Sequence, residues 1–547
     1  MRGACVLGYG VWITLTLVCC LPVVSAPVAG TAPAGVAALG RQLRIDVLWE
    51  GSAQGNVLYQ VRRAESADGE FTIMPHHVTL PVFTDFVGEP GKTFYYQVRA
   101  GRESNKRVIA TSTWSKTVSA ATGARNHEGL LAEVQEASVR CYTLASHPNS
   151  GMVKEWISTR KWPSRTRRGD RYGATGATGM GLSNLVVAVE RGYLSRESAR
   201  EKLLRTLRFL DTAADRFHGA YSHWIDNVSG KALPFSKYDD GGDLVETAML
   251  AQGLIIVREY FSGDNPREKE IRETANRIWR AIDWNWYRKD GTDTLYWHWS
   301  PRFGWKMNLP VVGFCETEIS YLLGIASPTH AIPASCYFRG WRHKRFGSDR
   351  KEHGIDLQLG RGKGGCTFWY YYSHIGLDPK RIRYKGRTMH EHFEDLCAVQ
   401  IRYMRSRAGE FQGYDKMWGL TASPGPDGYR GHKPSPTDNG TIGPTASLSA
   451  YLYAPKASQE CLDTMYDTYG KETWQELGFC EAFNPTRNWY HRGYLGIDAG
   501  TVAPMLENHR SGLLWRLFMN APEIKIALDK LEAEQPGTVV PSRDLPE

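Results

Sequence analysis

The carboxylates that could do chemistry are concentrated in one stretch, Tyr238–Thr247. Asp239, Asp240, Asp243 and Glu246 place four carboxylates within eight residues. If a helix begins near the two glycines between them, Asp243 and Glu246 lie on one helix face. Carboxylates that converge on one spot repel each other, so at least one pKa should rise. Such a carboxyl suits acid/base cleavage of a neutral bond, for example a glycosidic bond. The alternative is that these residues only complement a helix dipole.

The N-terminal stretch Met1–Ala26 predicts export. Arg2 gives a positive start, an apolar run follows between residues 6 and 24, and Val24-Ser-Ala26 has the small residues of a cleavage site. We therefore expect a secreted or periplasmic protein with no stable membrane insertion once this stretch is removed. Because the apolar run is long enough to span a bilayer, an uncleaved anchor is the alternative.

The cysteines of the remaining chain do not predict a metal site. Seven lie outside the export signal: Cys141, Cys315, Cys336, Cys366, Cys397, Cys461 and Cys480. None of them forms a CxxC pair, and the chain has no HExxH or EF-hand pattern. We expect no metal and no cofactor. Three disulfides are possible, and the sequence does not assign them.

Composition favours work on carbohydrate. Aromatic residues make up 12% of the chain, with 18 Trp and 27 Tyr, and aromatic rings stack well on sugar faces. A large aromatic core is the alternative. The net charge of +9 is modest, and we read the basic clusters Arg160–Arg171 and Arg339–Lys351 as solvated loops rather than a nucleic-acid surface. An anionic glycan substrate stays open.

The pattern along the chain predicts two domains after a linker at residues 27–40. Residues 41–122 alternate in short β-runs separated by turns, which predicts a small β-sandwich. The expected strands include Leu43–Trp49, Val57–Arg62 and Phe94–Arg99. The Tyr-Tyr-Gln-Val-Arg run of the last one resembles the penultimate strand of fibronectin type III modules. We interpret this domain as a spacer or docking module.

Residues 125–531 change to long amphipathic helices separated by aromatic, Gly-rich loops. The clearest helices are expected at Ser195–Ala213, Val245–Tyr260, Pro266–Ala281, Glu318–Leu323, His392–Arg405, Gln459–Tyr469 and Ile524–Glu534. About a dozen helices over this length are typical of a double ring of helices, and residues 532–547 form a tail. The predicted fold class is mainly α.

Several motifs, taken in order, resemble the bacterial glucoamylase-like family and are most similar to glycoside hydrolase family 144. They are Ala174–Leu182, Glu190–Arg196, Tyr238–Ala248, Tyr296–Pro301, Leu323–His330, Trp418–Ser423, Asp438–Ile442 and Glu507–Trp515. Characterised members of that family are inverting (α/α)6-barrel enzymes that act on β-1,2-glucans. The resemblance covers nearly all of the large domain and implies the same fold and activity here.

The resemblance also implies which residues form the catalytic site. The family's acidic cluster falls on Asp239, Asp243 and Glu246, and its separate loop glutamate falls on Glu316. Two departures put the linkage or chain-length preference in doubt, though not the reaction class. Cys315 stands where the family commonly has Asn, and residues 497–502 read Ile-Asp-Ala-Gly-Thr-Val where the family has Ile-Asp-Gln-Gly-Pro-Ile.

Our mechanistic hypothesis gives Glu316 the role of the acid that protonates the glycosidic oxygen. Asp243 is the first choice for the carboxylate that activates water, and Asp239 is the second choice. Glu246 would hold that water or a sugar hydroxyl. Inversion needs roughly 6.5–9.5 Å between the acid and base carboxyls. Without the resemblance, the more common role for a glutamate such as Glu316 is to brace its own loop rather than to act as an acid.

Seven further residues are candidates for contact with sugar: Trp297, His298, Trp299, Trp418, Asp438, Trp489 and Asp498. For the tryptophans, core packing is the alternative. His298 is more often a hydrogen-bonded structural residue, and Asp turns or buried pairs would equally explain Asp438 and Asp498.

Three other functions compete with a β-1,2-glucan hydrolase. A hydrolase of another glycan, neutral or anionic, would use the same scaffold. A polysaccharide lyase would need a Tyr or His base near a uronate carboxylate. A non-catalytic glycan-binding protein would not require the acidic cluster. In each case we expect a monomer whose partner is an oligo- or polysaccharide, and no nucleic acid.

Overall fold

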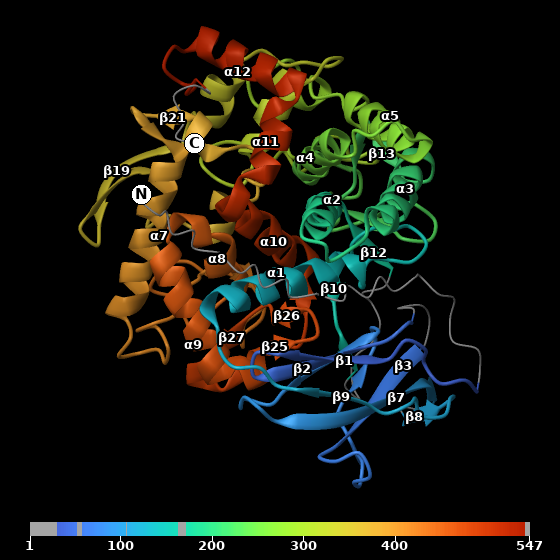
Figure 1. Ribbon diagram of the computed structural model, residues 1–547. Coiled ribbons are helices and arrows are strands. Elements are labelled where there is room, and N and C mark those ends of the chain that lie inside the picture. Colours follow the sequence, from blue (N-terminus) through green and yellow to red (C-terminus); the bar gives the residue numbers. More distant parts are fainter. Residues whose placement is uncertain (1–29, 52–56, 105–106, 162–170, 361, 542–547) are drawn as a thin grey trace, which may run out of the picture.

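The computed structural model describes residues 30–51, 57–104, 107–161, 171–360 and 362–541. The predicted export signal and most of the first basic cluster lie outside these ranges. Figure 1 shows a helix-rich body with a β-rich module packed against one side of it. No helix in the described ranges is long and apolar enough to cross a membrane.

The β-rich module is built from two antiparallel sheets. One has the order β1–β2–β6, formed by Ala37–Arg41, Arg44–Leu48 and Val82–Phe86. The other has the order β11–β5–β3–β7–β8, formed by Arg160–Lys161, His77–Val78, Val57–Ala64, Thr93–Ser104 and Arg107–Ala110. In addition, β4 (Thr72–Ile73) pairs with β3 and β9 (Val118–Ala121) pairs with β7.

The two sheets enclose one apolar core. Ile45, Val47 and Phe83 of the first sheet are buried together with Val61 and Val98 of the second, as alternation along each strand requires. The predicted strands are therefore present. The predicted linker is too long, because strand β1 begins inside it at Ala37 and pairs with β2 along its whole length. The specific likeness to fibronectin type III stays a prediction.

Twelve α-helices fall within the described residues. They are α1 (His127–Thr143), α2 (Thr175–Glu190), α3 (Arg196–Thr212), α4 (Leu244–Tyr260), α5 (Pro266–Arg280), α6 (Glu318–Ala326), α7 (Met389–Ser406), α8 (Pro444–Ser449), α9 (Pro455–Thr473), α10 (Gly496–Ser511), α11 (Leu513–Asn520) and α12 (Pro522–Glu534). The helices expected from periodicity are all found, and Ser195, the first residue of one expected range, is the N-cap of α3.

Helices α2 and α10 were not among the expected helices. Both are buried along most of their length, so neither shows the contrast between an apolar and a polar face on which an amphipathic pattern depends. Glycines set the distance between α2 and α4, since a Cβ on Gly179 would lie 2.3 Å from the carbonyl oxygen of Met249.

Short antiparallel pairs shape the loops between the helices. They are formed by β10 (Trp156–Ile157), β12 (Tyr172–Ala174), β13 (Arg216–Phe217), β14 (Ala220–Tyr221), β15 (Trp224–Asp226), β16 (Ala232–Leu233), β17 (Gly242–Asp243), β18 (His298–Trp299), β19 (Gly347–Glu352), β20 (Ile355–Leu359), β21 (Arg383–Tyr384), β22 (Arg387–Thr388), β23 (Ala422–Ser423), β24 (Arg430–Gly431), β25 (Trp474–Gln475), β26 (Gly478–Phe479), β27 (Phe483–Asn484), β28 (Trp489–Tyr490) and β29 (Tyr494–Leu495). The seven cysteines outside the export signal are all free thiols.

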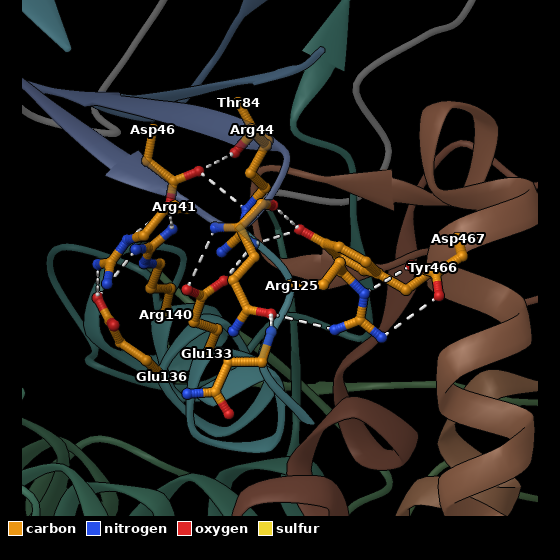
Figure 2. A network of polar contacts seen from close by, with 12 residues as sticks. Arg41, Arg44, Asp46, Thr84, Arg125, Glu133, Glu136, Arg140, Tyr466 and Asp467 are labelled. Atoms are coloured by element: carbon orange, nitrogen blue, oxygen red, sulfur yellow. Dashed lines mark hydrogen bonds and ion pairs between the residues drawn. The ribbon is translucent and has the colours of Figure 1, made fainter. Parts of the chain in front are cut away.

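A buried polar network joins the β-module to α1 and α9 (Figure 2). Asp46 of β2 is fully buried and accepts hydrogen bonds from Arg140 of α1 and Thr84 of β6, each at 2.9 Å. Arg44 is also fully buried, donates to the Tyr466 hydroxyl at 2.7 Å, and lies 4.2 Å over the Trp474 ring. The module is thus fixed to the helical body by ion pairs that water does not screen.

The charge of Asp46 should make a large contribution to stability. Burial would raise the pKa of Asp46, but the charges of Arg140, Arg44 and Arg41 hold it well below its usual range. We expect Asp46→Asn to lower the free energy of unfolding at neutral pH by about 3–5 kcal/mol, because two buried arginines lose their partner. Urea denaturation followed by circular dichroism measures this change.

The sign of the pH dependence follows from the lowered pKa. The contribution of Asp46 is complete above the unfolded-state pKa of about 3.9 and is lost as pH falls below it. The wild type should therefore lose stability on acidification more steeply than Asp46→Asn. Asp68→Asn, at an exposed position of the same module, is the control and should change stability by less than about 0.5 kcal/mol. An Asp46→Asn protein as stable as this control would contradict the assignment.

Candidate active site

The acidic stretch forms the start of helix α4, as its spacing predicted. Asp243 belongs to β17, opposite His298 of β18, and is the N-cap of α4. Its Oδ1 accepts hydrogen bonds from the backbone N–H groups of Val245 at 3.1 Å and Glu246 at 3.0 Å. Both alternatives considered for this stretch therefore apply to Asp243, which caps the helix and also contacts two histidines.

Two histidines share the second oxygen of Asp243. His223 Nδ1 donates to Asp243 Oδ2 at 3.2 Å, and His298 Nε2 lies 3.4 Å from the same atom. His298 Nε2 also forms an ion pair with Asp239 Oδ2 at 3.1 Å. Burial alone would raise the pKa of Asp243, but these contacts hold it well below its usual range. Asp243 is therefore ionised at neutral pH.

The same contacts keep both histidines protonated. Burial would lower the pKa of His223, but the charge of Glu246 and the hydrogen bond to Asp243 raise it to about 10. Burial would likewise lower the pKa of His298, which its contacts with Asp239 and Asp243 raise to about 9. Two imidazolium groups thus balance the carboxylates beside them.

Glu246 differs from Asp243 in its protonation although the two are three residues apart. Its Oε2 accepts a hydrogen bond from the Gly176 N–H at 2.7 Å, and its Oε1 lies 4.0 Å from His223. Burial and the charge of Asp243 raise the pKa of Glu246 to about 7, against the opposing effect of His223. Asp240 points elsewhere and pairs with Arg302.

Glu316 lies in the loop before α6 and is partly buried. Burial raises its pKa to about 7, and the charge of Asp243 contributes to the rise. Glu316 is therefore close enough to Asp243 to sense its charge, although some 70 residues separate them in the chain. The loop is held by the Ser373 hydroxyl, which donates to the carbonyl oxygen of Glu316.

A second acidic pair stands at the start of α10. Asp498 is 2% exposed and accepts a hydrogen bond from the Tyr372 hydroxyl, and burial raises its pKa to about 6. Glu481 is fully buried beside it, with Oε2 accepting from the Leu495 N–H at 2.8 Å. Burial and the charge of Asp498 raise the pKa of Glu481 well above its usual range. Glu155 interacts electrostatically with Glu246 and with this pair, so it connects the two acidic groups.

The four tryptophans predicted to contact sugar lie in three different environments. Trp297 stacks on His298, with ring centroids 5.9 Å apart, and Trp299 follows on the same strand with a partly buried ring. Trp418 is a wrong prediction, because its ring is 2% exposed and lies in the core, where it has no free face for a sugar. Trp489 packs at the β27–β28 turn beside His491.

Asp438 has a structural environment. Its carboxylate accepts hydrogen bonds from the hydroxyls of Tyr414 at 3.0 Å and Tyr403 at 3.2 Å, and from the Gly440 N–H at 3.2 Å. These contacts are those of an Asp turn braced by two tyrosines, the alternative given for it above. None of them involves the acidic residues at α4.

Sequence reasoning missed His223, Glu155, Glu481 and Tyr372. They lie far apart in the chain and belong to no compact motif. The one local signal was Glu481, a charge between Phe479-Cys480 and Ala482-Phe483. Such a residue is buried only when a partner satisfies it.

One group of side chains has the composition of a metal site. His223, Asp239 and Asp243 offer ligand atoms within 4.8 Å of one another. In this structure the same atoms are used in contacts among the histidines and aspartates themselves. The expectation that the protein needs no metal stays a prediction.

The arrangement has the parts that glycosidic bond hydrolysis requires. It combines a carboxyl that carries a proton at neutral pH, Glu316, with ionised carboxylates held by histidines at α4. Two carboxyl groups whose environments separate their pKa values are characteristic of acid/base pairs.

Comparison with known proteins agrees with this chemistry. A family model described as "Putative glucoamylase" matches residues 308–522. An exo β-1,2-glucooligosaccharide sophorohydrolase (non-reducing end) from Parabacteroides distasonis is 36% identical over 538 residues, which cover 94% of this chain and 72% of that protein.

Solved structures give the same result. A β-1,2-glucanase from Parabacteroides distasonis superposes with a TM-score of 0.85 at 35% identity, covering 93% of this chain and 74% of that one. An endo-β-1,2-glucanase from Chitinophaga pinensis superposes with a TM-score of 0.71 at 38% identity, covering 75% and 98%. An endo-β-1,2-glucanase from Talaromyces funiculosus, 12% identical with a TM-score of 0.55 over 75% of this chain and 91% of that one, shares the fold alone. This chain is a glycoside hydrolase and belongs to the glucoamylase-like family, together with β-1,2-glucanases of the family 144 type.

Proposed function

We propose that this protein hydrolyses β-1,2-glucan with inversion at the anomeric carbon. The observation that carries the proposal is Glu316, a largely buried carboxyl whose pKa is raised to about 7 within electrostatic reach of the ionised Asp243. Relatives named as an exo-acting sophorohydrolase and an endo-acting glucanase both support β-1,2-glucan as the substrate. Their names differ in the mode of action, so we make no choice between exo and endo cleavage.

We also propose that the helices close into an (α/α)6 barrel around this site. The support is that α2 packs on both α4 and α10, and that α4 in turn packs on α5, α6 and α11. The loops that carry the acidic residues would then meet at one end of the barrel. Export of the mature protein is a further part of the proposal, supported by the residue pattern of Met1–Ala26.

In the proposed mechanism Glu316 donates its proton to the glycosidic oxygen as the bond breaks. Water is activated on the α4 side. Both oxygens of Asp243 are occupied by the helix N–H groups and by histidines, whereas the contact of Asp239 with His298 uses only one of its oxygens. We therefore place Asp239 ahead of Asp243 as the base, which reverses the order expected from the sequence.

Asp498 is the alternative base. The Cys366 thiol interacts electrostatically with both Glu316 and Asp498, so both carboxyls lie near it. Asp239→Asn and Asp498→Asn distinguish the two assignments. The variant that removes the base should lose about 10²–10⁴-fold in kcat, and the other should mainly raise KM.

The reaction itself can be tested directly. We expect purified protein to release short oligosaccharides from linear β-1,2-glucan, with the first product formed as the α-anomer. Chromatographic sizing and ¹H NMR of the newly formed anomeric proton measure both. A β-anomer as first product would exclude inversion, and an unsaturated product absorbing in the ultraviolet would indicate a lyase. If other glucans are cleaved but β-1,2-glucan is not, the enzyme acts on a different linkage.

Replacing the acid should remove activity without loss of stability. We expect Glu316→Gln to lower kcat by about 10²–10⁴-fold and to leave the melting temperature equal or higher, because the burial that raises its pKa is unfavourable to the charged form. Glu318→Gln is the matched control two residues away. Glu318 contacts Tyr337 and His374, so this variant should lose stability and keep its kcat. The opposite pattern would contradict the assignment.

The pH dependence should report the proton on Glu316. We expect kcat/KM to fall as pH rises through about 7, because the acid loses its proton there. Because Glu246 has a pKa in the same range, Glu246→Gln is the control and should retain the descending limb. A flat profile through neutral pH in the wild type would contradict the role of Glu316.

A further inference from the structure

The β-module contacts the helical body at a second place, close to the acidic site. Strand β11 pairs with β5 of the module, with Arg160 opposite Val78. Just before this pairing, the Thr79 N–H donates to the Thr159 carbonyl at 2.9 Å, and the Thr79 hydroxyl donates to the Ser158 carbonyl at 3.0 Å. The segment at residues 154–161 therefore completes an edge of the module's larger sheet.

The other end of this segment lies at the site. Strand β10 pairs with β29, directly before α10 and Asp498, and the Gly496 N–H donates to the Glu155 carbonyl at 3.0 Å. Glu155 interacts electrostatically with Glu246 and Asp498. Its neighbour Trp156 is 42% exposed and lies 6.3 Å from the ring of Tyr429, which is 59% exposed. Exposed aromatic rings beside carboxylates suit contact with sugar.

Glu476 links the segment to the module and to the β25–β26 turn. It is fully buried and accepts hydrogen bonds from the Thr159 hydroxyl at 2.5 Å and from Arg160 Nε at 2.9 Å. His76 of the module lies 3.6 Å from Glu476 Oε1. The β25–β26 pair continues within two residues to Glu481, the partner of Asp498.

Apolar packing strengthens the same connection. Leu80 and Val82 of the module belong to one buried cluster with Ile157 of β10 and Ala499 of α10. The cluster therefore places module residues in contact with the elements that carry Glu155 and Asp498. A rigid, close-packed cluster of this kind transmits displacement of one member to the others.

We propose that the N-terminal β-module is a positioning element of the active site. Through the β5–β11 pairing and the hydrogen bonds of Thr79 it fixes the segment that presents Glu155 and Trp156 to the glucan. Glu476 holds the same segment through Thr159 and Arg160 and lies against His76 of the module. Glu476 acts on the sugar site only through this segment, so it is a positioning residue. This positioning role differs from the spacer or docking role that the sequence predicted for the module. The kinetic part of this inference rests on the proposed glucan hydrolysis.

The test compares two carboxylates at the contact between the module and the helical body. Glu476→Gln weakens the contacts with Arg160 and with His76 near the site, and Glu133→Gln removes the contact of α1 with Arg44 in the other network. Thr159→Val is a milder second variant that keeps the charge of Glu476. For each variant we would measure the melting temperature, kcat and KM on β-1,2-glucan, and backbone hydrogen exchange at residues 154–161 and 494–498.

We expect Glu476→Gln and Thr159→Val to lower kcat/KM about tenfold or more, mainly through KM, since small displacements of positioning groups have effects of this size. Hydrogen exchange in both segments should become faster. Glu133→Gln should lose stability but keep the wild-type kcat/KM and the wild-type exchange in these segments. If Glu476→Gln and Thr159→Val behave like Glu133→Gln, the proposal is wrong.

The exchange measurement separates this inference from the proposed function. If the wild-type protein does not hydrolyse β-1,2-glucan, the proposed function fails while exchange at residues 154–161 still reports whether Glu476 fixes this segment. Unchanged exchange in both variants, with full activity of the wild type, would overturn the positioning role alone.

Discussion

The active site depends on the cost of removing carboxylates from water. Asp239, Asp243 and Glu246 are all less than a tenth exposed, and an uncompensated charge there would be strongly unfavourable. His223 and His298 compensate two of the three, and the third, Glu246, keeps its proton up to about pH 7. Burial also raises the pKa of Glu316 to about 7, and the charge of Asp243 adds to the rise. One constraint therefore produces both the ionised and the protonated members of the site.

The fold provides the burial that this division requires. Asp243 caps helix α4, which is buried from Leu244 to Val257, and α2 approaches closely enough for the Gly176 N–H to bind Glu246. A side chain at Gly176 would occupy the position of that carboxylate, 2.5 Å from its Oε2. The β-module packs against one side of the helical body (Figure 1) and is tied to α1 and α9 by Arg44 and Asp46.

Sequence patterns predicted the helices and strands better than they predicted which distant residues contact one another. The amphipathic helices and the β-strands have strong periodicity, and Ser195 and Asp243 stand at helix starts as their residue types favour. The acidic stretch was visible because its members are adjacent in the chain. His223 and Glu155 were not visible in the sequence. They lie just before β15 and β10, and only the packing of these strands brings them to the site, which no local pattern encodes. Trp418 was misassigned since an aromatic residue in a Gly-rich loop has the same local sequence whether it is buried or exposed.

The central claim is that Glu316 holds a proton at neutral pH while Asp243 beside it does not. Infrared difference spectroscopy of wild type minus Glu316→Gln, recorded across a pH titration, measures this directly through the carbonyl stretch of the protonated carboxyl. The account predicts a band that belongs to Glu316 and disappears with a midpoint near pH 7. A midpoint near the ordinary glutamate value of about 4.3 would contradict it.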